Sequence, residues 1–256
     1  MAANNKKLRV TELDFDNIKS NLKTFLKNQN QFKDYDFEGS GMNILLDTLA
    51  YNTHYLGFNA NMVANEMFLD SSSLRSSVVS HAKSLGYEVT SARAPVATLN
   101  ITLSTTSAFK TMSAGTAFTT TVDGTSYQFV TVSDVTASNT GNAIAFDGTL
   151  VYEGTYITTK YLVDTSDVDQ RFILTDPATD TTTLSVKVQN SASDTTTTTY
   201  VKATDISQLT GASTVYYLQE IDKGRFEVYF GDGVVSKALT NGNIVILQYV
   251  VTNKGA

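Results

Sequence analysis

Residues 42–69 read MNILLDTLAYNTHYLGFNANMVANEMFL, and the spacing of their apolar residues predicts one long helix. At about 100° of rotation per residue, the large apolar side chains fall on two opposite sides, separated by polar seams. A surface helix of a globular protein buries one apolar face, so this helix needs cover on two. The first side holds Met42, Leu45, Leu46, Leu49, Leu56, Ala60, Val63, Ala64 and Met67, and the second holds Ile44, Tyr51, Tyr55, Phe58, Met62 and Leu69.

Two explanations account for the second apolar side. Either the helix is central and packed on both sides by its own domain, or one side meets another subunit. The neighbouring sequence offers only two further short helices, and monomers rarely leave a large apolar patch exposed, which favours the subunit. The candidate partner-binding residues are therefore Leu45, Leu49, Leu56 and Val63 on one face and Tyr51, Tyr55, Phe58 and Met62 on the other.

Two shorter helices are predicted around this one. The first runs from Phe15 to Leu26, with Asp14 or Asp16 placed to cap its start. The other follows the capping run Asp70–Ser73, carries an apolar stripe of Leu74, Val78, Ala82 and Leu85, and ends at Gly86. Before the long helix, Gly39-Ser40-Gly41 is expected to form a flexible start and an N-terminal cap.

The composition changes at Ala94-Pro95. Threonine, which favours strands, occurs 5 times before Pro95 and 33 times from it onward. Basic and acidic residues balance before Pro95 (10 against 10), whereas the later part has 9 against 15 and carries the whole net charge of −6. These shifts predict an α+β protein: a helical assembly module over residues 1–94, then a threonine-rich, mainly antiparallel β region over 95–256, with an inserted subdomain within 140–215.

The β region contains clear strand signals. Val96–Ser104 alternates apolar and polar residues strictly, and Asp123-Gly124, Asp147-Gly148 and Lys223-Gly224 are hairpin or turn candidates. The tract from Ser191 to Thr199 fits either an exposed loop or a threonine-rich edge strand. Further strands are expected over 127–132, 184–188, 215–221, 226–230 and 244–251.

Composition also limits the function. The 256 residues include no cysteine, which excludes disulfides, thiolate metal sites and a cysteine nucleophile. A net charge of −6 argues against nucleic-acid binding, which needs a basic face. The sequence contains no run of about 18 apolar residues, so no membrane span is predicted.

Candidate chemistry is sparse. His54 lacks a second ligand four residues away, and His81 fits a hydrogen-bonded interior or interface position. Gly231-Asp232-Gly233 follows a predicted strand and lacks the ligands of a calcium loop, so we interpret it as a structural turn or bulge in which glycine allows positive φ. No catalytic residue, metal, cofactor or small-molecule substrate is predicted.

Several stretches together resemble a known family. Phe230–Val234, followed by Leu239–Val245 and a strand ending at Tyr249, is similar to baseplate J-like proteins of contractile phage tails. The helical stretches 39–41, 49–55, 61–70 and 85–87, leading to Ala94-Pro95, resemble the baseplate wedge proteins of T-even-type phages. Those proteins are longer, and this chain stops at Asn253–Ala256 within a motif that continues in the family, so it is expected to be an N-terminal fragment or a short relative.

The resemblance implies a structural subunit of the virion that is assembled in the host bacterial cytoplasm. Its partners would be a second copy of itself and other baseplate wedge subunits, joined through a helical bundle in the inner baseplate that responds to sheath contraction. Neither a cofactor nor an enzymatic activity is implied. The alternative from the residues alone is a glycan-binding or adhesin-like β module, which would leave the two-sided helix unexplained.

Overall fold

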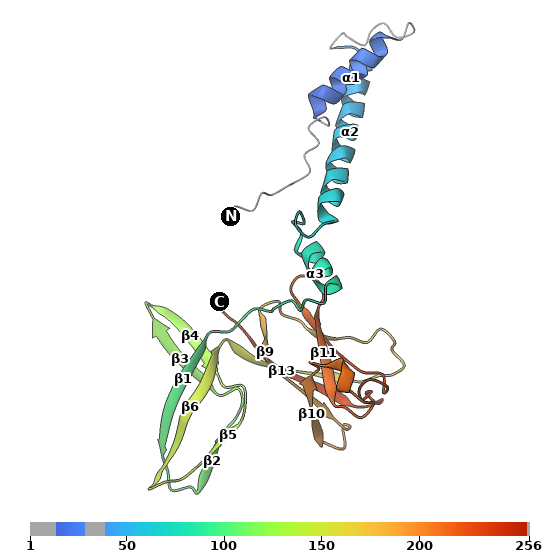
Figure 1. Cartoon of the computed structure of the whole chain (residues 1–256). Coiled ribbons are helices and arrows are strands. Elements are labelled where there is room, and N and C mark those ends of the chain that lie inside the picture. Colours follow the sequence, from blue (N-terminus) through green and yellow to red (C-terminus); the bar gives the residue numbers. More distant parts are fainter. Residues whose placement is uncertain (1–13, 29–38, 255–256) are drawn as a thin grey trace. The chain divides into compact units, whose positions relative to one another are not determined.

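The computed structural model describes residues 14–28 and 39–254, and the chain divides into two compact units, Met1–Glu88 and Val89–Ala256. The first unit holds the described helices of more than one turn, and the second holds mainly antiparallel sheets (Figure 1). The predicted α+β class is confirmed. In the sequence, the first unit ends at Glu88, six residues before the boundary expected at Ala94-Pro95.

The helices of the first unit follow the predicted order. Ser40 caps the long helix, because its hydroxyl accepts a hydrogen bond from the Asn43 amide at 3.1 Å. Asp14 occupies the N-cap position of the first helix, but its side chain makes no capping hydrogen bond. The helices are α1 (Phe15–Lys27), α2 (Gly41–Glu66) and α3 (Arg75–Ser84).

The predicted cap of the third helix is wrong. α3 starts after Leu74, and the preceding serines do not cap it. The hydroxyls of Ser71 and Ser72 instead bond to the Asn65 and Glu66 carbonyl oxygens at the end of α2. The buried side chain of α3 is Val79, whereas Leu74, Val78 and Leu85 of the expected apolar stripe are exposed.

The second unit contains three sheets. Four strands pair in the order β1-β6-β4-β3, two pair as β2-β5, and seven pair in the order β7-β13-β9-β10-β11-β12-β8. The four- and two-stranded sheets use residues 96–153, and the seven-stranded sheet uses residues 155–251. The strands are β1 (Val96–Ser104), β2 (Phe109–Met112), β3 (Ala117–Val122), β4 (Thr125–Val130), β5 (Val135–Ser138), β6 (Ala143–Glu153), β7 (Thr155–Leu162), β8 (Phe172–Leu174), β9 (Thr179–Gln189), β10 (Thr197–Lys202), β11 (Val215–Glu220), β12 (Phe226–Phe230) and β13 (Ile244–Val251).

Every strand segment expected from the sequence overlaps a strand, although 127–132 extends past the end of β4 and 215–221 past the end of β11. The threonine tract is a loop up to residue 196 and then becomes β10, which lies between β9 and β11 and is not an edge strand. The expected inserted subdomain within 140–215 stays a prediction. The strands of this range share their sheets with strands from outside it.

Two of the three expected turns are hairpins. Asp123-Gly124 is a two-residue loop between paired Val122 and Thr125, and Lys223-Gly224 lies in the three-residue loop 222–224 between β11 and β12; both dipeptides have positive φ at both residues. Asp147-Gly148 is not a turn, because it lies inside β6 opposite a register shift in β1. There Gly148 has φ +67° and donates its amide hydrogen to Asn100 Oδ1 at 2.8 Å, forming a bulge.

The seven-stranded sheet curls so that its two edge strands face each other. Tyr161 on β7 donates its hydroxyl hydrogen to the Ile173 carbonyl of β8 at 2.7 Å, and its ring packs edge-on against Phe172, with centroids 5.6 Å apart. Burial raises the pKa of the Tyr161 phenol, which keeps the hydroxyl protonated as a donor. This one side chain therefore links the two edge strands and gives the Ile173 carbonyl a partner.

Tyr161→Phe should destabilise the second unit by about 1 kcal/mol, because the Ile173 carbonyl loses its partner while the ring contact stays. Urea unfolding followed by tyrosine fluorescence would measure the change. Tyr200→Phe is the matched control, since Tyr200 belongs to the same core but makes ring packing without a hydroxyl bond among the described residues. Equal effects of the two substitutions would contradict the closing role.

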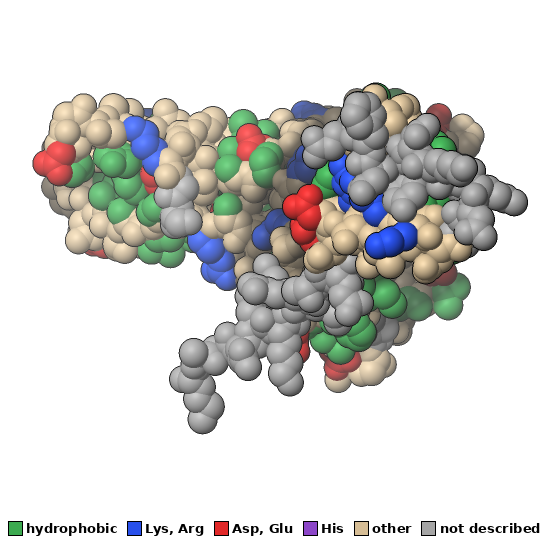
Figure 2. Space-filling view, turned by 90° about the horizontal axis from the view of Figure 1, so that it is seen from above, with side chains coloured by type: hydrophobic (Ala, Val, Ile, Leu, Met, Phe, Trp, Pro, Cys, Tyr) green, Lys and Arg blue, Asp and Glu red, His purple; other side chains and the backbone are tan. Residues whose placement is uncertain are grey.

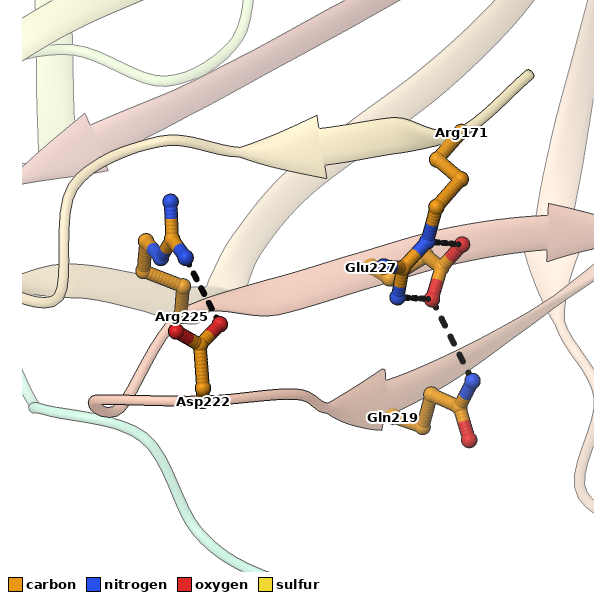
Figure 3. Close-up of polar contacts among 5 residues, drawn as sticks. All are labelled: Arg171, Gln219, Asp222, Arg225 and Glu227. Atoms are coloured by element: carbon orange, nitrogen blue, oxygen red, sulfur yellow. Dashed lines mark hydrogen bonds and ion pairs between the residues drawn. The ribbon is translucent and has the colours of Figure 1, made fainter. Parts of the chain in front are cut away.

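A charged network crosses the outer side of this sheet near β8 (Figure 3). Arg171 binds Glu227 through two parallel hydrogen bonds, Nε to Oε1 at 2.8 Å and Nη2 to Oε2 at 2.6 Å. Gln219 on β11 donates to the same carboxylate at 3.3 Å. Glu227 is buried, so this bidentate partner compensates for its desolvation and fixes the short strand β8 against β12.

The lobe formed by β1–β6, at the left of Figure 2, is mainly tan, with few charged side chains. Tan marks uncharged polar side chains and the backbone, and threonine is the most frequent residue of that kind in the β region. Its small interior includes Ile144, Phe146 and Val151 on β6 and Val130 on β4. The larger core of the second unit lies within the seven-stranded sheet.

Candidate assembly surface on the helical unit

α1 covers only a narrow line of α2. The buried residues of α2 are Asn43, Leu46, Ala50 and Gly57, spaced by three, four and seven residues. α1 packs beside the first part of α2, with Ile18 buried and Lys19 paired to Asp47 (Figure 1). α1 has 13 residues against 26 in α2, so it can follow only about half of the longer helix.

All eight residues predicted to bind a partner are exposed. Their relative exposure ranges from 40% at Met62 to 65% at Tyr51 and Val63, values typical of side chains directed into solvent. We call the two groups stripe A and stripe B. Stripe A consists of Leu45, Leu49, Leu56 and Val63, and stripe B consists of Tyr51, Tyr55, Phe58 and Met62.

The two stripes and the buried line lie on three different sides of α2. With 100° per residue, stripe A and stripe B each lie about 100–120° from the buried line, and a polar seam including Asn52 and Asn59 separates them. The sequence pattern placed Leu46 on the same apolar side as the residues of stripe A, but Leu46 is buried. The structure therefore leaves both stripes uncovered within the described part of the unit.

The glycine motif lies in the second unit, in the loop after β12. Gly233 has φ +91° and donates its amide hydrogen to the Ser236 carbonyl at 2.8 Å, and Asp232 Oδ1 accepts from the Val234 amide at 2.9 Å. Gly231 has ordinary φ, but an added Cβ would overlap the Ser236 hydroxyl and lie 2.6 Å from the Ser236 carbonyl oxygen. Glycine is thus needed at position 233 for its positive φ and at position 231 because a Cβ does not fit there.

Glu66, the last residue of α2, joins that helix to α3. Its Oε1 accepts hydrogen bonds from the amide and hydroxyl of Ser73, both at 2.8 Å, and from the Leu74 amide at 3.3 Å. A hydrogen bond from the Ser77 hydroxyl and those from Ser73 and Leu74 lower the pKa of Glu66 from 4.5 to about 2. The carboxylate caps α3 from across the joint, a role that the sequence pattern did not predict.

The contribution of the Glu66 carboxylate to the joint between α2 and α3 should be lost as the pH falls below about 4.5. A carboxyl whose pKa is lower in the folded state stabilises it above the unfolded pKa near 4.5, and this contribution is lost as the pH falls toward about 2. Amide hydrogen exchange at Ser73 and Leu74, compared between pH 5 and pH 3, would measure the weakening. Unchanged protection factors at pH 3 would contradict it.

The described residues offer no site for metal chemistry. No group of three or more His, Asp or Glu side chains in residues 14–28 and 39–254 could hold a metal ion. His81, half-buried, shares a hydrogen bond of 2.9 Å with the Glu66 carbonyl, in agreement with the interior or interface position expected for it. None of the described helices has the length and hydropathy needed to cross a membrane.

Comparison with known proteins assigns the two units to one family. Residues 14–87 match the family described as "Baseplate wedge protein gp6-like, helical domain", and residues 157–254 match "Bacteriophage baseplate wedge protein gp6, third domain". The chain is also 32% identical, over 263 aligned positions, to the baseplate wedge protein gp6 of Enterobacteria phage T4. The chain belongs to the gp6-like family of baseplate wedge proteins.

The family assignment confirms the resemblance drawn from the helical and glycine motifs. The alignment to the phage T4 protein covers 93% of this chain and 38% of that relative, so the chain spans less than half the length of its relative. The second family match begins at residue 157, close to the start of the seven-stranded sheet at Thr155. Residues 157–254 fall within the seven-stranded sheet and its loops, while β1–β6 lie between the matches.

Proposed function

We propose that the chain is a structural subunit of the baseplate wedge in a contractile phage tail, with α2 as its assembly surface. It pairs there with a second copy of itself and with neighbouring wedge proteins through a helical bundle. The observation that carries the proposal is the exposure of eight large apolar side chains on two sides of one helix. Membership of the gp6-like family supports the choice of partner class.

The two stripes fit a bundle better than a single pairwise contact. Leucine, tyrosine, phenylalanine and methionine at helical spacing pack against the equivalent side chains of adjacent helices. Each side chain that becomes fully buried contributes about 1.5–3 kcal/mol, so leaving both stripes in water is costly. Because the stripes point in different directions, one added helix can cover one stripe, and a second is needed for the other.

The same proposal gives the chain a location in the virion and a structural role without catalysis. The chain resides in the tail baseplate of the virion, is assembled in the host bacterial cytoplasm, and transmits the sheath-contraction signal mechanically. It acts on no substrate and needs no cofactor. A glycan-binding or adhesin-like module is not favoured, because it accounts for neither the two stripes nor the family of both units.

Mass spectrometry of purified tail particles from the source phage tests the location. Peptides from both units of the chain should be found in the tail fraction, in fixed ratio to other baseplate proteins. Their absence from intact tails that contain the other baseplate proteins would overturn the proposal.

A further inference from the structure

The connection between α2 and α3, residues 67–74, is built as a fixed joint. It contains three consecutive serines, a composition typical of flexible linkers. α3 continues beyond the end of α2 and does not lie along it (Figure 1), so side-by-side packing of the two helices does not set its direction. Hydrogen bonds of the joint and of the helix residues beside it connect α3 to α2.

Each serine of the joint is hydrogen-bonded back to the end of α2. The Ser71 hydroxyl donates to the Asn65 carbonyl at 2.6 Å, and the Ser72 hydroxyl lies 3.3 Å from the Glu66 carbonyl and 2.7 Å from the Phe68 carbonyl within the joint. Ser73 donates both its amide and its hydroxyl hydrogen to Glu66 Oε1. These bonds satisfy carbonyls that a helix end leaves without partners, and they hold the turn in one conformation.

Glu66 attaches α3 at two separate points. Its carboxylate receives the amides of Ser73 and Leu74 at the start of α3, and its carbonyl oxygen bonds His81 Nε2 at 2.9 Å, about two turns further along. One attachment would fix only where α3 begins. Two attachments, at 74 and 81, also fix the direction of the helix axis.

We infer that Glu66 and His81 lock α2 and α3 into a rigid elbow that carries movement of one helix directly to the other. The inference goes beyond the proposed function, because it concerns the shape that the isolated chain already holds and needs no partner. A displacement of α2 in any assembly would then turn α3 with it, without being absorbed by the serine-rich segment.

Pulsed electron paramagnetic resonance on the full chain tests the elbow. The chain lacks cysteine, so Asn59→Cys on α2 and Ser80→Cys on α3, both at exposed positions, give one defined pair of spin labels. In the parent we expect one narrow distance distribution. Glu66→Ala and His81→Leu should each broaden it about twofold or more, and Glu66→Ala should lower amide protection at Ser73 and Leu74 about tenfold.

Asp70→Asn is the matched control, because it removes a carboxylate from the same joint that makes no hydrogen bond among the described residues. It should leave the distribution narrow, and circular dichroism should show unchanged helix content in every variant. A broad distribution in the parent would overturn the inference. So would a narrow one in both Glu66→Ala and His81→Leu, or equal broadening by Asp70→Asn.

Discussion

Gly154→Ala should destabilise the second unit by about 3–5 kcal/mol and lower its melting temperature by roughly 10 °C. Gly154 joins the four-stranded to the seven-stranded sheet and has φ +134°. An added Cβ would overlap the Val251 carbonyl oxygen of β13 and lie 2.9 Å from Val250 Cγ1. Because one obstacle is the backbone of a paired strand, it cannot move aside without disturbing the sheet.

Gly148→Ala tests the cost of positive φ alone, without the lack of space found at Gly154. Gly148 lies on the same strand as the residues leading to Gly154 and has φ +67°, but a Cβ added at Gly148 would meet no atom within 4 Å beyond its chain neighbours. The substitution should cost only about 1 kcal/mol. Thermal unfolding of both variants by calorimetry would compare them, and similar losses for the two would contradict the close approach at Gly154.

Tyr55→Lys and Leu56→Lys should each weaken assembly by about 2–4 kcal/mol, a loss of roughly 30- to 1000-fold in affinity, without unfolding the chain. The two residues are adjacent in sequence but lie on stripe B and stripe A, so each variant places one charge on one stripe. Both side chains are exposed, and lysine suits an exposed helix position. Sedimentation velocity over a concentration series would measure self-association.

Asn59→Lys provides the control for the added charge, because it lies on the polar seam between the stripes and is exposed. It should assemble like the parent. If Asn59→Lys weakens assembly as much as the stripe variants, the effect is general repulsion and the assignment of the stripes is wrong. Parent-like assembly of both stripe variants would also contradict it.

The sequence predicted α2 well because the periodic spacing of its apolar residues extends over many turns. Over the 26 residues of α2, the spacing of large apolar residues indicated two sides, and the eight selected residues are exposed. Sequence patterns predicted six of the thirteen strands in the described residues, where period-2 alternation or apolar runs beside turn dipeptides such as Asp123-Gly124 signal local geometry. These features depend on neighbours in sequence.

The features that were missed depend on contacts that residue composition does not specify. Ser71 and Ser72 carry the composition of a helix cap, but their hydroxyls bond to the Asn65 and Glu66 carbonyls at the end of α2 instead. Asp147-Gly148 has the residues of a hairpin, yet β6 continues through it because β1 supplies Asn100 as a partner. The closing of the seven-stranded sheet by Tyr161 involves strands at opposite ends of the sheet order, which no local pattern encodes.

Photo-crosslinking in assembled tails tests the central claim most directly. A photoreactive amino acid at position 55 or 56 samples stripe B or stripe A, and the same group at position 59 samples the seam between them. We predict strong crosslinks from 55 and 56 to a second copy or to another wedge protein, and weaker ones from 59. Tails that incorporate the chain but give no crosslinks from 55 or 56 would contradict α2 as the assembly surface.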